Sequence, residues 1–221
     1  ANDHSIAWSI AKLANSHGAE IAVSHLPDKN ERKRNEMRIR KLVEPLGVKV
    51  IAPCDVQDDD QMDVFFEYVR HELGGIDFVV HSIAFANVDD IKGATIDCSR
   101  DGFKLAMDIS AYSYLAVAKR AANIMNDGGS ILGLSYYGGE KVIPGYNMMG
   151  VCKSALEMAI KYAAFDLGPR QIRSNGISAG PLRTLAASAV GDFREMMSLY
   201  ENISPLGRGI DGTDVANAAL Y

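Results

Sequence analysis

Cysteine is scarce in this sequence, with three residues among 221, at positions 54, 98 and 152. Their odd number and wide spacing predict neither a disulfide framework nor a zinc site. The five histidines form no pair at the helical spacing of metal ligands, so we expect no metal site from them either. The low cysteine content is typical of a reducing compartment, and we expect a cytoplasmic protein.

Long apolar runs and an excess of positive charge are also lacking. No stretch approaches the ~20 apolar residues that span a bilayer, so we expect no membrane-spanning segment. The formal net charge of −5 argues against a protein built mainly to bind nucleic acid. One basic run, with seven Lys and Arg between Lys29 and Lys41, has acidic neighbours and is better explained as a solvated helix face than as a nucleic-acid patch.

The sequence has no initiator Met and no glycine-rich phosphate-binding turn near its start. It opens at a helix N-cap, after which Ile6, Ile10 and Leu13 recur at helical spacing until Gly18 ends the helix. We expect a strand with the glycine-rich turn to precede this helix, and the helix at 213–221 to continue. The single domain expected over residues 1–221 is therefore without its first strand and its C-terminal end.

Predicted strands and helices alternate along the whole chain. The strand runs are apolar throughout and do not alternate with polar residues, as is typical of strands buried on both faces of a parallel sheet. The fold class predicted is α/β, a doubly wound, Rossmann-like parallel sheet, whose ligand site lies at the carboxyl ends of the strands. Strands are expected at 21–24, 48–53, 78–83, 130–135 and 173–178, and helices at 5–18, 29–43, 102–125, 147–167 and 213–221, with one more ending near residue 73 and a turn at 126–129.

One pair of residues near the end of a predicted strand suggests chemistry. Tyr146 and Lys153 are seven residues apart, so on one helix they share a face at roughly 10 Å along the axis. A phenol can donate a hydrogen bond to an oxygen that gains negative charge, and a nearby ammonium eases that donation. Taken alone, such a pair is more often a packed ring and a solvated amine, but its place at the expected ligand edge favours a catalytic role.

The segment around this pair resembles the active site of a known family. Residues 135–153, Ser-Tyr-Tyr-Gly-Gly-Glu-Lys-Val-Ile-Pro-Gly-Tyr-Asn-Met-Met-Gly-Val-Cys-Lys, are similar to those of bacterial-type enoyl-acyl-carrier-protein reductases. These enzymes form a divergent branch of the short-chain dehydrogenase/reductases, with Tyr-x6-Lys in place of the usual Tyr-x3-Lys. Here Met149, which cannot donate a proton, stands four residues before Lys153, so the spacing fits the divergent branch.

The resemblance covers essentially the whole chain, and it implies roles for individual residues. Tyr136, Tyr146 and Lys153 match catalytic positions, and Ala86 and Tyr146 match substrate-binding positions. For Ile83 and Leu182 the alternative is simple core packing of the side chains. Cofactor-binding positions are matched by Ser5, Ile6, Asp55, Val56, Ile83, Lys153, Leu182, Thr184 and Ala186. The segment from Thr184 to Tyr200 resembles the helical flap that covers the substrate in this family.

The resemblance further implies an activity, a cofactor and partners. The expected reaction is reduction of the trans-2 double bond of an enoyl thioester on acyl carrier protein, with NADH, by a homotetramer. NADPH is not excluded, because His25-Leu26-Pro27 stands where an acidic residue normally holds the ribose 2′-hydroxyl. Two alternatives remain open: a carbonyl or alcohol oxidoreductase of the wider superfamily, and a non-catalytic nucleotide-binding scaffold.

Overall fold

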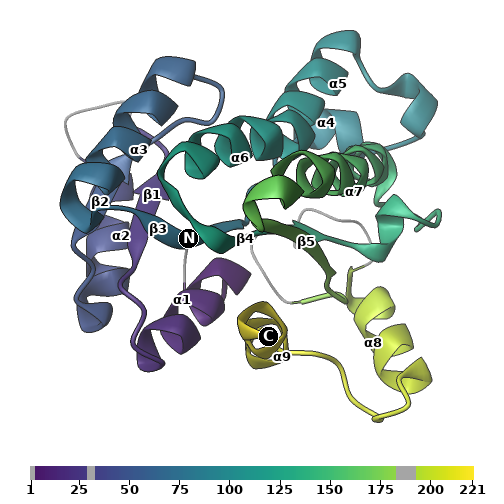
Figure 1. Ribbon diagram of the computed structural model, residues 1–221. Helices are drawn as coiled ribbons and strands as arrows, with labels where there is room; N and C mark the ends of the chain where they lie inside the picture. Colours follow the sequence, from purple (N-terminus) through teal and green to yellow (C-terminus); the bar gives the residue numbers. More distant parts are fainter. Residues whose placement is uncertain (1–2, 29–32, 183–192) are drawn as a thin grey trace.

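The computed structural model describes residues 3–28, 33–182 and 193–221, in which helices and parallel strands alternate (Figure 1). The elements before the middle of the chain are α1 (Ile6–Ser16), β1 (Ala22–His25), α2 (Arg34–Val43), β2 (Val50–Pro53), α3 (Asp59–Leu73), β3 (Ile76–His81) and α4 (Val88–Ile91). They are followed by α5 (Arg100–Met107), α6 (Ser113–Ile124), β4 (Met125–Ser135), α7 (Asn147–Leu167), β5 (Arg173–Ser178), α8 (Phe193–Ile203) and α9 (Gly212–Leu220). No helix in these described ranges is long and apolar enough to cross a membrane.

The strands form two parallel sheets, β1–β2 and β3–β4–β5. β1 pairs with β2 from Ala22 opposite Val50 to His25 opposite Pro53, and β4 pairs with β5 up to Ser135 opposite Ser178. Within each sheet the paired strands run in the same direction, so their carboxyl ends lie at one edge of that sheet. This confirms the predicted α/β class with parallel strands.

Helices cover both faces of the β3–β4–β5 sheet (Figure 1). On one face α3, α6 and α7 pack through a core that includes Met62, Tyr114 and Leu156 against Ile131 of β4. On the other face α1 and α9, from distant parts of the sequence, lie side by side and contribute Ile10 and the pair Val215 and Ala216. The sheet is thus the middle of three layers, which leaves its carboxyl edge available for a ligand.

Local signals in the sequence explain where several helices begin and end. Ser5 caps α1 by accepting a hydrogen bond from the Trp8 backbone N–H, and Asp58 caps α3 in the same way from Gln61. Gly18 and Gly74 follow α1 and α3 with φ of +92° and +77°, the left-handed conformation that glycine adopts most readily. The predicted ends of both helices are confirmed.

Two predicted features differ in the structure. The helix expected at 102–125 begins at Arg100 and is interrupted by a π-helical turn, Asp108–Tyr112, between α5 and α6. The turn expected at 126–129 lies inside β4, where the pairing with β3 shifts between Met125 opposite Ile76 and Ser130 opposite Phe78. Polar and glycine residues that resemble a turn are thus accommodated as an irregularity of the strand.

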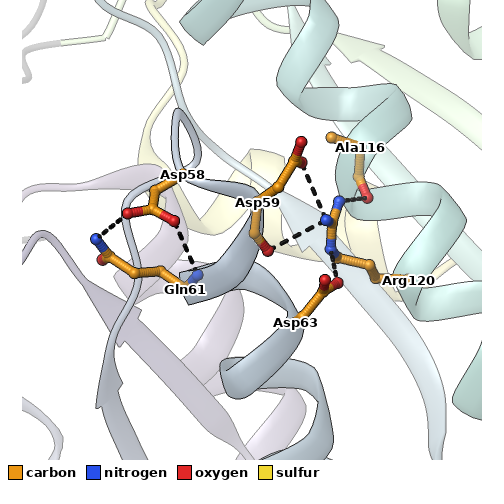
Figure 2. Close-up of polar contacts among 6 residues, drawn as sticks. All are labelled: Asp58, Asp59, Gln61, Asp63, Ala116 and Arg120. Atoms are coloured by element: carbon orange, nitrogen blue, oxygen red, sulfur yellow. Dashed lines mark hydrogen bonds and ion pairs between the residues drawn. The ribbon is translucent and has the colours of Figure 1, made fainter.

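α6 is tied to the first turns of α3 by Arg120, as Figure 2 shows. Its guanidinium donates to the carboxylates of Asp63 at 2.6 Å and Asp59 at 3.0 Å, and to the Ala116 carbonyl at 3.2 Å. Its side chain is only 12% exposed, whereas both carboxylates are largely exposed. The contact fixes the start of α3, and with it the loop that leaves β2.

Candidate active site

Tyr146 stands immediately before α7, on a backbone that Asn147 holds in place. Asn147 has φ +43°, a left-handed conformation that asparagine tolerates better than most side chains. Its amide Nδ2 donates to the carbonyls of Ile91 at 2.7 Å and Gly93 at 2.9 Å. The start of α7 is thereby fastened to the loop after α4. Asn147 was not singled out by the sequence analysis, because its partners lie far away in the chain.

The rings of Tyr136 and Tyr146 pack edge to face, with centroids 4.7 Å apart. Gly138 allows this approach, since a Cβ at that position would come within 2.4 Å of the Tyr146 ring. The Tyr136 hydroxyl lies 3.4 Å from that of Tyr200 on α8, a segment that the sequence analysis compared with a flap. The structure therefore brings two of the three predicted catalytic residues into contact.

Burial decides the protonation of these two phenols. It raises the pKa of Tyr146 well above its ordinary value, and it does the same for Tyr136, where Tyr200 adds to the effect. Both phenols stay protonated at neutral pH. In the described part of the chain no group is hydrogen-bonded to the Tyr146 hydroxyl, so its proton is available to an incoming acceptor.

Lys153 lies on α7 and is buried, with a side chain directed at the end of β4. Its Nζ donates to the Leu134 carbonyl at 2.6 Å. Burial lowers the pKa of the Lys153 ammonium to about 8, against smaller opposing effects of Cys152 and Glu157. An ammonium has three protons, and this contact uses one of them. Lys153 is thus not a solvated surface amine, whereas the Tyr146 ring is packed, as the ordinary explanation of the Tyr–Lys spacing expects.

The ammonium does not lower the pKa of Tyr146 in this structure, contrary to a simple expectation from their spacing. The influences on the pKa of Tyr146 are burial first and Cys152 second, both of which raise it. Lys153 instead acts on His81, at the end of β3. The phenol is therefore a protonated donor, and the ammonium is a separate positive charge deeper in the site.

His81 forms a buried polar link that the sequence analysis did not predict. Its Nε2 lies 2.8 Å from the Ser113 hydroxyl, which donates its own proton to the Ile109 carbonyl at 2.6 Å. Ser113 must therefore accept from His81, so the neutral ring carries its proton on Nε2. Burial, reinforced by the charge of Lys153, lowers the pKa of His81 to about 4, and its Nδ1 has no partner in the described residues.

The remaining predicted cofactor residues lie at or near the carboxyl edge of the strands. Ser5 caps α1, and Ile6 and Leu182 pack into the core beneath the β3–β4–β5 sheet. Asp55 donates its backbone N–H to the Gln61 side chain at 3.1 Å, and Val56 packs into the opposite core. The packing expected as an alternative for Leu182 is present, which leaves its backbone for a ligand.

Two further predicted positions follow β3, and two lie outside the description. Ile83 is half-buried after the strand, and Ala86 packs beside Met148 and Cys152. Thr184 and Ala186, predicted to bind the cofactor, fall outside the described residues, as does most of the segment compared with a flap. The geometry thus gathers a protonated phenol, a buried ammonium and several strand ends at one edge.

Comparison with protein families and curated proteins gives a consistent result. The family model described as enoyl-(acyl carrier protein) reductase matches residues 1–221. The chain is 48% identical over 221 residues to the enoyl-[acyl-carrier-protein] reductase [NADH] FabI of Synechocystis sp., of which it covers 85%. It is 50% identical to enoyl-[acyl-carrier-protein] reductase [NADH] 1 of Rhizobium meliloti, of which it covers 79%.

Solved structures of similar proteins have the same fold. The enoyl-(acyl-carrier-protein) reductase of Anaplasma phagocytophilum, in complex with NAD, superposes with a TM-score of 0.93 at 48% identity, and the match covers all of this chain and 82% of that one. The Bacillus cereus enoyl-acyl carrier protein reductase, in complex with NADP+ and indole naphthyridinone, superposes with a TM-score of 0.93 at 45% identity. This match covers all of this chain and 84% of that one.

Proposed function

The chain belongs to the enoyl-(acyl carrier protein) reductase family, and from that premise we propose its reaction. It reduces the trans-2 double bond of enoyl thioesters on acyl carrier protein in fatty acid elongation, with NADH as the coenzyme. The observation that carries the assignment of the site is the Tyr146 phenol, protonated and available beside Tyr136 at the carboxyl edge of a parallel sheet.

The residues at this edge fit a nicotinamide coenzyme. The ammonium of Lys153 uses one proton on the Leu134 carbonyl, so two remain for the hydroxyls of the nicotinamide ribose. His25, the last residue of β1, is buried, and its Nε2 has no hydrogen-bond partner in the described residues. Asp55 and Val56 would hold the adenine, and Ser5, Ile6, Ile83 and Leu182 would contribute backbone or packing contacts along the coenzyme.

Tyr146, which precedes α7, and Lys153, on α7, would have different catalytic roles. When bound, the dihydronicotinamide supplies a hydride to the β-carbon of the enoyl thioester. Tyr146 donates a hydrogen bond to the thioester carbonyl oxygen and stabilises the enolate that forms there, before the α-carbon takes up a proton. Lys153 positions the ribose and adds positive charge, so that orientation and fixed electrostatics supply most of the acceleration. Tyr136 holds the Tyr146 ring from the side.

The choice between NADH and NADPH depends on the end of β1. Relatives from Synechocystis sp. and Rhizobium meliloti are named as NADH enzymes, whereas the Bacillus cereus structure holds NADP+. Asp28 lies three residues after β1, and its two carboxylate oxygens each accept one backbone N–H, from Asn35 and Glu36. Lone pairs remain on both oxygens, so this carboxylate could still accept from a ribose hydroxyl. We propose NADH as the main coenzyme of this chain.

A turnover assay with three substrate classes tests this function. The full-length protein is mixed with NADH and a crotonyl thioester, and the decrease in NADH absorbance is followed. Parallel assays use a ketone and, with NAD, an alcohol. Turnover of the enoyl thioester alone is expected. Turnover of the ketone or alcohol alone would support the alternative oxidoreductase, and coenzyme binding without turnover would support a scaffold.

We further propose a cytoplasmic homotetramer built on the exposed face of α7. Four apolar side chains at helical spacing lie on that face, and Phe165, the most exposed of them, is 80% accessible. A contiguous exposed apolar face of this kind marks a protein interface. The four residues are Val151, Met158, Tyr162 and Phe165. We propose that residues 1–221 act as one coenzyme-binding and catalytic domain.

A further inference from the structure

The π-helical turn between α5 and α6 lies against the loop that follows β3. Such turns insert a residue into a helix, and they are frequent at functional sites. Here the turn spans Asp108–Tyr112 and contains Ser110, whose side chain is fully buried. None of the roles implied by the family resemblance falls on Ser110. A buried hydroxyl needs hydrogen-bond partners, so those of Ser110 indicate what it does.

Ser110 satisfies both backbone groups of a single residue in that loop. Its Oγ accepts from the Phe85 N–H at 3.0 Å and donates to the Phe85 carbonyl at 3.0 Å. The hydroxyl has one proton and spare lone pairs, so both bonds can form at once. The loop has no regular secondary structure at this point, and the two bonds fix the backbone of Phe85 against the helix.

Phe85 lies between the residues expected to contact the coenzyme and the substrate. Ile83 comes two residues earlier, and Ala86 comes next and packs beside Met148 of α7. Beyond this loop, the end of α4 and the residues after it are fastened to the start of α7 by Asn147. A shift of the Phe85 backbone would therefore move Ile83 and Ala86 relative to Tyr146.

We propose that Ser110 is a positioning residue, which uses both of its hydrogen bonds to Phe85 to set the loop Ile83–Ala86 for the coenzyme and the enoyl thioester. This inference rests on the proposed function, since Ile83 and Ala86 owe their roles to it. Ser110 itself touches neither ligand. Its contribution is geometric, and misplacement of reacting groups by about 1 Å can cost about a hundredfold in rate.

The test compares Ser110→Ala with a matched control, Ser174→Ala. Ser174 is also a buried serine with two hydrogen bonds, to the Tyr114 hydroxyl and the Ile160 carbonyl, but it lies in the core away from the loop. Both variants lose one buried hydroxyl, so both are expected to lower the melting temperature. Ser110→Cys, which keeps a weak donor at the same position, serves as the conservative variant.

Two readouts separate positioning from general destabilisation. Hydrogen exchange is measured on the peptide covering 82–87, with and without NADH, and kcat and KM are measured with crotonyl thioester. For Ser110→Ala we expect faster exchange at Phe85 and a fall in kcat/KM of roughly tenfold or more. Ser110→Cys is expected to recover part of both. Ser174→Ala is expected to keep wild-type exchange in this peptide and wild-type kcat/KM at temperatures well below melting.

Unchanged exchange and unchanged kcat/KM in Ser110→Ala would overturn the proposal. So would equal effects of Ser110→Ala and Ser174→Ala, because these would reflect loss of stability alone. The failure of the proposed function looks different: the wild-type protein itself would not reduce crotonyl thioester. In that case the hydrogen-exchange comparison still tests whether Ser110 holds the loop.

Discussion

Burial shifts the pKa values of Tyr146 and Lys153 in opposite directions. Tyr146 keeps its proton because the phenolate is disfavoured in the protein interior, whereas Lys153 loses its proton more readily because the ammonium is disfavoured there. The hydrogen-bond donor is therefore secure over the physiological range. The positive charge is not, since the pKa of Lys153 lies at about 8. The activity should thus respond to pH through the lysine.

We expect kcat/KM for NADH to be constant up to about pH 8 and then to fall as Lys153 loses its proton, approaching tenfold per pH unit. Unfolding does not explain such a loss. The folded pKa lies below the ordinary value of 10.5, so between these two values the unfolded chain binds more protons and stability rises with pH. Lys161→Met, which alters an exposed lysine of the same helix, should leave the profile unchanged. A flat profile to about pH 10 would contradict the role of Lys153.

At the scale of elements, local signals predicted helix ends better than they predicted interruptions. Gly18 and Gly74 carry their own backbone preference, so they could be recognised without knowledge of the fold. The π-helical turn at Asp108–Tyr112 has no such local sign, because its residues suit an ordinary helix and the turn is stabilised by contacts with β3 and its loop. The strand irregularity at 126–129 was missed for a related reason: pairing with β3 overrides a turn-like sequence.

The contacts that Arg120 makes between α6 and α3, here called the Arg120 clamp, give a prediction at the scale of elements. Arg120→Leu removes bonds to Asp59, Asp63 and the Ala116 carbonyl, and should lower the free energy of unfolding by about 1–3 kcal/mol, measured in urea. Arg120→Lys should lose less, since an ammonium still reaches one carboxylate. Arg70→Leu breaks an exposed pair with Glu67 on α3, which solvent screens, and should leave the free energy of unfolding nearly unchanged. Equal losses for Arg120→Leu and Arg70→Leu would show that the Arg120 clamp adds no stability.

For the whole molecule, the sequence predicted the architecture and the Tyr–Lys pair but not the contacts that support them. Alternating apolar strands and helices are enough to specify a doubly wound fold, and the spacing of Tyr146 and Lys153 is readable along one helix. The link from His81 to Ser113 joins residues 32 positions apart, and that from Ser110 to Phe85 joins residues 25 apart. Each residue type is common, so its role emerges only when the chain is folded.

The proposed tetramer can be tested on the apolar face of α7. Replacing both Tyr162 and Phe165 by Glu places two charges on this face, where they would be buried in an interface at high cost. We expect the mass in sedimentation equilibrium to fall from that of four chains to that of two or one. Ile96→Glu, at a position that is 93% exposed outside α7, is the control and should remain tetrameric. An unchanged mass for the double variant would place the interface elsewhere.

The most direct test of the proposed reaction is the effect of Tyr146→Phe on reduction of crotonyl thioester by NADH. Removal of one preorganised donor to the developing enolate should lower kcat by roughly a hundredfold or more. The dissociation constant of NADH should stay within about twofold, because the phenol donates to substrate and not to coenzyme. Tyr137→Phe, which changes an exposed neighbour, should keep wild-type kcat. Full activity in Tyr146→Phe would contradict the assignment of this site.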